Sequence, residues 1–99
     1  MLLAVAACGP TVGDPCTTKS DCLDRSCLNG PSLPGGYCST SCSASVSCPV
    51  GSVCVHDGIS AGTDGCFHSC DFDSQCRSGY VCRFQRNSEK QICVGPNGL

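Results

Sequence analysis

The chain has 99 residues, a formal net charge of −2 and only 14% charged residues, so it lacks the clustered basicity of a nucleic-acid-binding protein. It contains no tryptophan, three phenylalanines and two tyrosines, against 12 glycines and six prolines. Burial of so few large apolar side chains does not offset the conformational entropy lost on folding. Thirteen cysteines are typical of a disulfide scaffold, and we expect disulfides to hold the fold together.

The N-terminal residues 1–7 form an apolar run that ends in small residues, which is typical of an export signal. The run is shorter than a usual export signal and lacks the Lys or Arg that normally begins one. A start codon assigned too far downstream would explain both features. Val5-Ala6-Ala7-Cys8 resembles a bacterial lipobox, which implies lipidation of Cys8. A plain secretory leader, or an intermolecular disulfide at Cys8, is the alternative.

Residues 8–15 contain two prolines and no apolar periodicity, so we expect the lipid anchor to continue into a flexible tether. No stretch approaches the roughly 20 apolar residues of a membrane span. Any membrane contact is therefore expected to come through the lipid.

The remaining twelve cysteines repeat in groups of four. The series Cys38-x3-Cys42-x5-Cys48-x5-Cys54 recurs as Cys66-x3-Cys70-x5-Cys76-x5-Cys82, which indicates an internal duplication. Extended outward, the repeat predicts three units at residues 16–38, 42–66 and 70–93, followed by a tail at 94–99.

Each unit is predicted to contain one short β-hairpin. Val, Tyr, Phe and Ile lie next to the third and fourth cysteines, and Gly, Asn and Asp lie between them, in the second unit at Asp57-Gly58 and Gly62-Thr63-Asp64-Gly65. Gly51 and Gly79 occupy equivalent places and predict a turn with positive φ before the first strand. The first unit has no glycine there, so its turn must differ. We expect a small disulfide-rich fold of three tandem hairpin units, each with two disulfides and little other regular structure.

Four cysteines in a unit allow three pairings, and spacing alone does not choose among them. The layout resembles cysteine-rich modules of the EGF-like type, although those carry a third disulfide that these units lack. The resemblance implies that the first cysteine pairs with the third and the second with the fourth. It gives Cys16–Cys27, Cys22–Cys38, Cys42–Cys54, Cys48–Cys66, Cys70–Cys82 and Cys76–Cys93.

Stretches such as Gly35-Gly36-Tyr37-Cys38 and Cys76-Arg77-Ser78-Gly79-Tyr80-Val81-Cys82 also resemble a family of cysteine-rich-repeat bacterial lipoproteins. Some members of that family are likened to the N-terminal cysteine-rich region of Dickkopf proteins. The resemblance implies an envelope location and no established activity.

Metal and catalytic motifs are missing from the sequence. No Cys-x2-Cys zinc knuckle occurs, and His68, two residues after Cys66, is one of only two histidines. Asp71-x-Asp73 lacks the glycine and distal glutamate of a calcium loop, and Asp71 is expected to cap a turn instead. We expect no metal, no cofactor and no enzymatic activity.

The favoured function is a structural or binding (adhesion) module, monomeric and held at the outer membrane or cell surface by its lipid. Its partner would be a protein or glycan. The candidate binding loop lies in the third unit and mixes cations with an aromatic side chain, which predicts an anionic partner; it comprises Arg83, Phe84, Arg86 and Lys90. The alternative is a small secreted protease inhibitor or toxin-like effector, with Arg25, Arg77 or Arg83 as its specificity residue.

Overall fold

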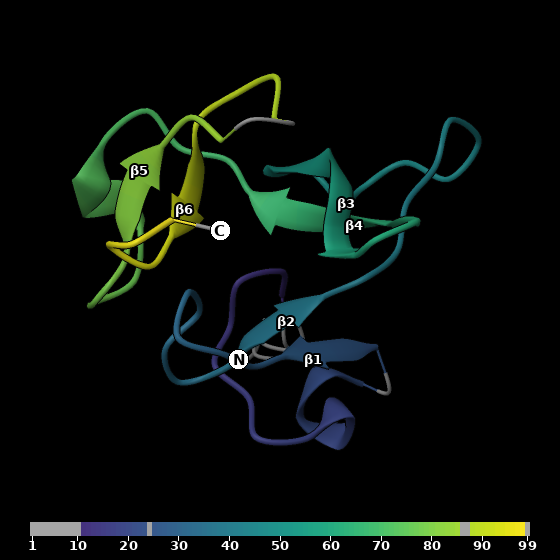
Figure 1. The fold of residues 1–99 in the computed structure, drawn as a ribbon, viewed down its shortest axis with the longest axis horizontal. Coiled ribbons are helices and arrows are strands. Elements are labelled where there is room, and N and C mark those ends of the chain that lie inside the picture. The colour runs from purple at the N-terminus through teal and green to yellow at the C-terminus, as the bar shows by residue number, and fades with distance from the viewer. Residues whose placement is uncertain (1–10, 24, 86–87, 99) are drawn as a thin grey trace, which may run out of the picture.

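A computed structural model of the chain describes residues 11–23, 25–85 and 88–98. Its regular structure consists of three two-stranded antiparallel hairpins, one in each four-cysteine unit (Figure 1). They are β1 (Ser26–Leu28) with β2 (Tyr37–Ser39), β3 (Ser52–Ser60) with β4 (Thr63–His68), and β5 (Val81–Arg83) with β6 (Ile92–Val94).

In the described part of the chain, short 3-10 helices precede the first and third hairpins: η2 (Lys19–Cys22) and η3 (Asp73–Gln75). Within the described residues there is no helix with the length and hydropathy needed to cross a membrane. The predicted fold class, small and disulfide-rich with one short hairpin in each unit, is confirmed.

Six disulfides join the first cysteine to the third and the second to the fourth in every unit. These are the six pairs that the EGF-like resemblance implies: Cys16–Cys27, Cys22–Cys38, Cys42–Cys54, Cys48–Cys66, Cys70–Cys82 and Cys76–Cys93. The third and fourth cysteines face each other across the two strands of each hairpin, as at Cys54 and Cys66. Each strand of a hairpin is therefore tied to the loop that precedes the hairpin, and not to its partner strand.

The segment before each unit's first cysteine also pairs with that unit's second strand. Cys38 N–H donates to Asp14 O at 2.8 Å, and Cys66 N–H donates to Thr40 O at 3.0 Å. In the third unit the corresponding contact is an isolated bridge between Ser69 and Ile92. Each hairpin thus gains a short third segment, which partly satisfies the edge of a sheet too small to be stable alone.

The second hairpin differs from the sequence-based expectation. Of the two segments expected to turn, Asp57-Gly58 lies inside β3, at an irregularity between Val55 and Ser60. The chain turns after Ser60, at Ala61-Gly62, where the second of these segments begins. A Cβ on Gly58 would lie 2.7 Å from the Phe67 ring. The glycine is required because the strand passes directly over this buried aromatic side chain.

The turns before the first strands follow the predicted pattern. Gly51 has φ of 90° and Gly79 has φ of 88°, the left-handed conformation that glycine adopts without a steric cost. In the first unit the left-handed residue is Leu23, with φ of 55°, which comes directly after the second cysteine. The turn of that unit therefore differs, as expected.

A side-chain cap closes the first loop in two units. Asp21 Oδ2 accepts the N–H groups of Thr17 and Thr18, and Gln75 Oε1 accepts those of Asp71 and Phe72. Both capping residues directly precede the second cysteine of their units. The expectation that Asp71 caps this turn is wrong: its backbone N–H is capped by Gln75, because a side chain from the C-terminal end of the turn reaches back to it.

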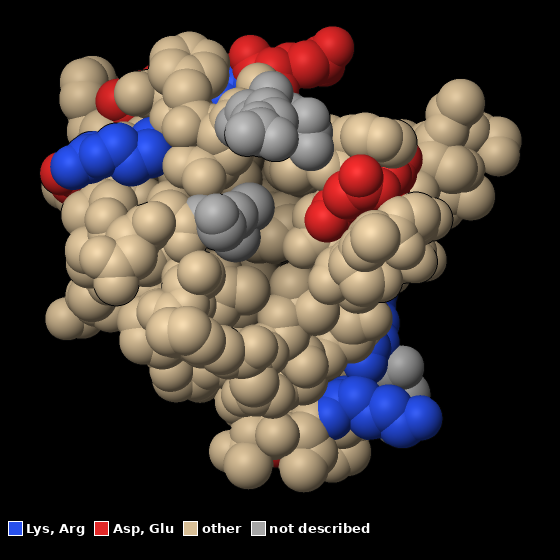
Figure 2. All heavy atoms as spheres, viewed as in Figure 1, with Lys and Arg blue, Asp and Glu red and all other residues tan. Residues whose placement is uncertain are grey.

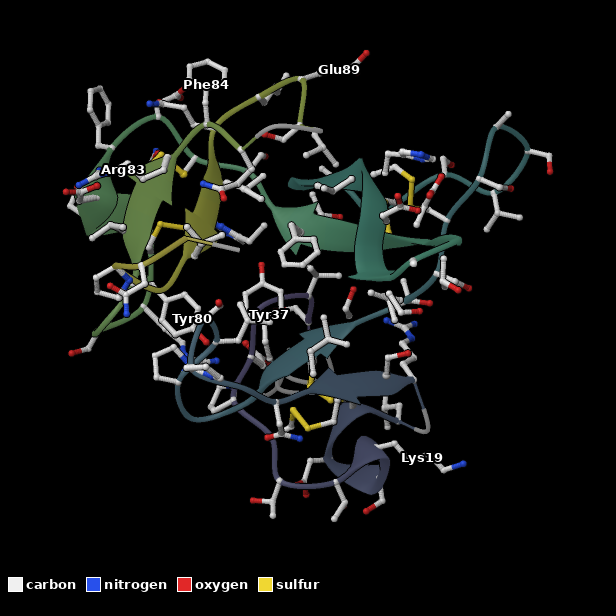
Figure 3. The ribbon with its side chains drawn as sticks, in the orientation of Figure 1. Lys19, Tyr37, Tyr80, Arg83, Phe84 and Glu89 are labelled. Atoms are coloured by element: carbon white, nitrogen blue, oxygen red, sulfur yellow. A yellow bond between two sulfur atoms is a disulfide. The ribbon has the colours of Figure 1, made fainter. Side chains whose placement is uncertain are left out.

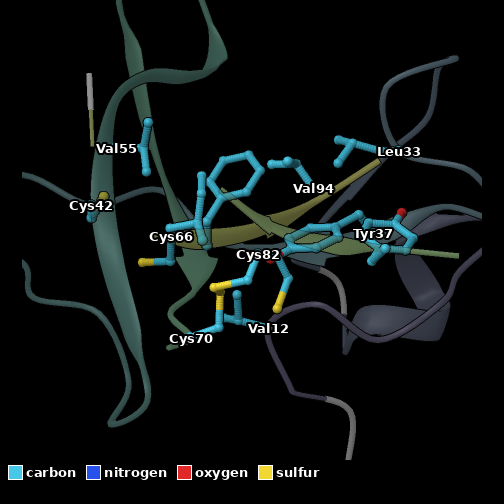
Figure 4. Close-up of a cluster of buried hydrophobic side chains, with 13 residues drawn as sticks. Val12, Leu33, Tyr37, Cys42, Val55, Cys66, Cys70, Cys82 and Val94 are labelled. Atoms are coloured by element: carbon cyan, nitrogen blue, oxygen red, sulfur yellow. A yellow bond between two sulfur atoms is a disulfide. The ribbon is translucent and has the colours of Figure 1, made fainter. Parts of the chain in front are cut away.

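The three hairpins share one core, in which each unit supplies an aromatic side chain (Figure 4). The Tyr37 ring of β2 stacks on Phe67 of β4 with centroids 5.1 Å apart, and on Tyr80 before β5 at 5.8 Å. Tyr37, Phe67 and Tyr80 are all buried. The units therefore pack around a common centre, although each is closed by its own disulfides.

The prediction of a flexible tether at residues 8–15 is wrong for the part that the structure describes. Val12 is buried, Gly13 N–H donates to Cys38 O at 2.8 Å, and Asp14 O accepts from Cys38 N–H. The segment is ordered because it supplies the third strand-like segment of the first unit. At the other end, β6 extends to Val94, and Gly95 N–H donates to Ser32 O at 2.9 Å.

Candidate functional site

The candidate binding loop lies on the outer side of the third unit, away from the shared core (Figure 3). Phe84 is 65% exposed, and Arg83 and Lys90 are also exposed. Phe72, which follows the first cysteine of the same unit, is 67% exposed. Two of the three phenylalanines of the protein therefore point to solvent from one unit. Arg86, the fourth predicted member of this loop, lies outside the described residues.

A groove of about 310 Å³ lies beside Phe84. Asp71 and Glu89 line it together with Lys90, so its charged side chains are of both signs. Arg83 is not part of the groove: its Nη1 lies 3.2 Å from Asp73 Oδ1 and donates to Cys82 O at 2.8 Å. The cationic character that the sequence suggested for this loop is therefore offset by neighbouring carboxylates.

The outer surface has no large charged patch on the face shown in Figure 2. Blue and red side chains are few on this face, and most of the visible surface is uncharged. Aromatic side chains are thus the most distinctive feature of the third unit.

Arg77 connects the third unit to the first. Its Nη1 donates to Gly13 O at 2.7 Å, and its Nη2 donates to Pro34 O and Gly36 O, both at 2.6 Å. The guanidinium also lies 4.3 Å from the centre of the Tyr80 ring, and Tyr80 Oη donates to Pro34 O at 3.0 Å. Arg77 is therefore occupied within the molecule and does not project as a protease-specificity residue would.

A cavity of about 320 Å³ lies beside this junction. His68, Arg77 and Tyr37 line it, together with the Cys76–Cys93 disulfide. His68 Nδ1 lies 3.3 Å from Cys93 Sγ, and the Tyr37 hydroxyl accepts the His68 backbone N–H at 2.8 Å. Burial raises the pKa of Tyr37, so its hydroxyl stays protonated. Sequence reasoning linked His68 with Cys66, its near neighbour in the chain; the fold brings it to Cys93.

A histidine and two aspartates meet on the second hairpin. His56 Nδ1 lies 3.0 Å from Asp64 Oδ1, and His56 Nε2 lies 3.6 Å from Asp57 Oδ2. Apart from disulfide-bonded cysteines, these are the described residues whose ligand atoms lie close enough to hold one cation together. Both ring nitrogens face carboxylates, which is the geometry of a surface ion-pair network. No local motif indicates it, because Asp64 reaches His56 only across the hairpin.

The proposed lipidation residue, Cys8, lies outside the described residues. The twelve other cysteines are all in disulfides, and numerous disulfides are typical of exported proteins.

Comparison with models of known protein families finds no match. Comparison with curated proteins and with solved structures finds none either.

Proposed function

We propose that the protein is an exported, non-enzymatic binding module that holds a protein partner on the outer face of its third unit. Cys8 would carry a lipid and anchor the module to a bacterial envelope membrane. The single observation that carries the proposal is the exposure of Phe72 and Phe84, at 67% and 65%, on a unit closed by two disulfides.

Exposed aromatic side chains of this kind favour binding. Phenylalanine is a large apolar side chain, and aromatic residues are enriched where proteins contact their partners. Both phenylalanines lie on short segments that disulfides hold in place, so little conformational entropy is lost when a partner binds. A rigid scaffold that displays loops is a common arrangement of binding proteins.

The groove beside Phe84 favours a partner that presents both an apolar group and charges of both signs. Lys90 can pair with a carboxylate, while Asp71 and Glu89 can pair with a cation. A uniformly anionic partner would be repelled by the carboxylates of Asp71 and Glu89. The groove therefore favours a protein surface that carries charges of both signs.

The protease-inhibitor alternative is less well supported. Two of its three candidate arginines, Arg77 and Arg83, are held by partners within the molecule. Arg25 remains exposed between the second and third cysteines of the first unit. An assay of the oxidised protein against a panel of serine proteases should show no inhibition.

Affinity capture tests the binding face. The oxidised protein is immobilised and exposed to envelope proteins of the bacterium that produces it, and the bound proteins are identified. Wild type is compared with the double variant Phe72→Ser/Phe84→Ser. We expect at least one envelope protein to bind wild type and to be lost from the double variant, and the isolated pair to bind in solution with the same difference.

Val50→Ser is the matched control, since Val50 is a fully exposed apolar residue on the second unit; its capture profile should equal that of wild type. A profile that is unchanged by the double substitution, or the absence of any captured envelope protein, would contradict the proposed function. Intact mass of the exported protein tests the anchor separately, because a diacylated Cys8 adds a defined mass to the N-terminus.

A further inference from the structure

The cavity at the junction of the first and third units contains both half-cystines of one disulfide, Cys76–Cys93. Its volume of about 320 Å³ is at the lower end of the range for small-molecule sites. The Cys22–Cys38 disulfide also borders a space in the described structure, but that space has essentially no volume. Cys76–Cys93 is therefore placed where a small molecule can reach it.

The two sulfurs of this disulfide have different surroundings. Cys76 is partly exposed, whereas Cys93 is buried at 4% exposure. The buried sulfur contacts His68 Nδ1 at 3.3 Å, and Cys93 lies in β6 beside fully buried Ile92 and Val94. One sulfur is thus open to attack, and the other lies beside a histidine ring nitrogen, which can donate a hydrogen bond to it in the Nδ1–H tautomer.

A histidine next to a cysteine sulfur favours the thiolate form, because it donates a hydrogen bond or a proton to the developing negative charge. In thiol–disulfide exchange the sulfur with the better-stabilised thiolate is the better leaving group. His68 therefore favours cleavage in which Cys93 leaves and Cys76 is attacked. Accessibility favours the same reaction, because Cys76, the half-cystine that would be attacked, is the more exposed of the two.

We propose that Cys76 is a thiol-modification site, at which a low-molecular-weight thiol forms a mixed disulfide while Cys93 is released with help from His68. The incoming thiolate attacks Cys76 Sγ and forms a new S–S bond to it. The Cys76–Cys93 bond breaks, and its electron pair goes to Cys93 Sγ. His68 Nδ1–H donates to that sulfur. No net oxidation occurs, because one disulfide replaces another.

The size and charge of the cavity define the class of thiol. A volume of about 320 Å³ admits a small molecule but not a folded protein. Arg77 and Asp14, one cationic and one anionic side chain, both line the cavity, so it does not strongly select a charged thiol. Small, neutral thiols fit it best.

Exposure alone predicts a different outcome. Among the cysteines of the described residues only Cys54 is exposed, so accessibility by itself makes Cys42–Cys54 the first disulfide to open. The disulfide that opens first therefore distinguishes the two explanations: Cys76–Cys93 if His68 activates the site, and Cys42–Cys54 if accessibility alone decides.

The test uses 2-mercaptoethanol on the oxidised full chain, at fixed pH and for short times. Samples are quenched with acid, alkylated with N-ethylmaleimide and mapped by peptide mass spectrometry. Rapid quenching matters because the sulfurs of Cys70, Cys76 and Cys93 lie within 4.8 Å of one another, so a freed thiolate can exchange further. We expect the first product to carry mercaptoethanol on Cys76 and N-ethylmaleimide on Cys93.

His68→Phe removes the donor and keeps the ring, and we expect it to slow opening of Cys76–Cys93 by about tenfold, the effect of losing one charge-assisted hydrogen bond. His68→Gln is a second variant that tests the same role if the Phe variant folds poorly. It should also slow the opening of Cys76–Cys93, because an amide does not transfer a proton. The matched control is His56→Phe, at the other histidine of the chain, which should react at the wild-type rate.

Three results would overturn the proposal: opening of Cys42–Cys54 first, an adduct on Cys93 instead of Cys76, or a rate in both His68 variants at least as high as in wild type. None of these measurements depends on the binding face of the third unit, so this inference and the proposed function succeed or fail separately.

Discussion

In this small molecule, hydrogen bonds between single side chains and the backbone help to stabilise the loops. Asp21 shows this clearly. Its carboxylate accepts two backbone N–H groups of the first loop, and these hydrogen bonds lower its pKa below the ordinary value of 3.8. Because the unfolded chain lacks these bonds, Asp21 stabilises the fold above that pH. The contribution is lost as the pH falls through the lowered pKa of the folded state.

We predict that Asp21→Ala lowers the denaturation midpoint at neutral pH, and that the difference from wild type shrinks as the pH falls below about 3.8. Guanidinium titrations of the oxidised protein at neutral and acidic pH measure this difference. Asp71→Ala is the control, since Asp71 is an exposed carboxylate of the equivalent loop in the third unit and the cap there comes from Gln75. A constant difference at all pH values would contradict the prediction.

Other residue-level contacts could not be read from the chain. The sequence indicates a cationic loop around Arg83, but the pairing of Arg83 with Asp73 requires two segments to be brought together by the Cys70–Cys82 disulfide. The contact of His68 with Cys93 likewise spans 25 residues. A sequence motif identifies residues that are close along the chain. These two pairs are close only in the folded structure, so no motif predicts them.

At the scale of elements, the hairpins follow from a few residue types at fixed places. Apolar residues next to paired cysteines form the strands, and glycine supplies the left-handed turns at Gly51 and Gly79. The length of β3 was not predictable, because Asp57-Gly58 is a turn sequence that packing against Phe67 keeps inside a strand. Tertiary contact overrides local turn preference there.

Two glycines with similar dihedral angles provide a test at this scale. Gly36 has φ of 81°, and a Cβ there would overlap the Cys16 carbonyl oxygen; Gly51 has φ of 90° and open space around it. Gly51→Ala should therefore cost about 1–2 kcal/mol of unfolding free energy from the left-handed conformation alone. Gly36→Ala should cost about 2–5 kcal/mol, because overpacking adds to that strain.

Denaturant unfolding of both glycine variants with intact disulfides measures these losses. Equal losses would show that the contact between Gly36 and Cys16 is not a constraint on the first unit.

For the whole molecule, the important feature is that three separately cross-linked units share one core. Tyr37 stacks on Phe67 and on Tyr80, so a side chain of the first unit contacts aromatic rings of the other two. Arg77 adds hydrogen bonds from the third unit to the first. The relative positions of the hairpins in Figure 1 follow from these contacts.

Arg77→Met tests this connection between units. The substitution keeps an unbranched side chain over Tyr80 but removes the donors to the carbonyls of Gly13, Pro34 and Gly36. We predict a loss of about 1.5–3 kcal/mol of unfolding free energy, as for hydrogen bonds to a charged group. The measurement is chemical denaturation with all six disulfides intact.

Arg25→Met is the matched control, because Arg25 is an exposed arginine between the second and third cysteines of the first unit, as Arg77 lies between those of the third; it should change stability little. Equal stability of the two variants would mean that Arg77 does not hold the units together.

The amino-acid sequence by itself determined that disulfides stabilise this protein, that it is built from three repeated units with one hairpin each, and that a left-handed turn precedes the hairpin in the second and third units. These properties depend on composition and on spacing along the chain, which the sequence states directly. Only the tertiary structure decided that residues 11–15 are part of the first unit, that Arg77 faces inward, and that His68 meets Cys93 beside a cavity. The physical reason is that a disulfide fixes distances within a unit, whereas the packing of Tyr37, Phe67 and Tyr80 fixes how the units lie against one another.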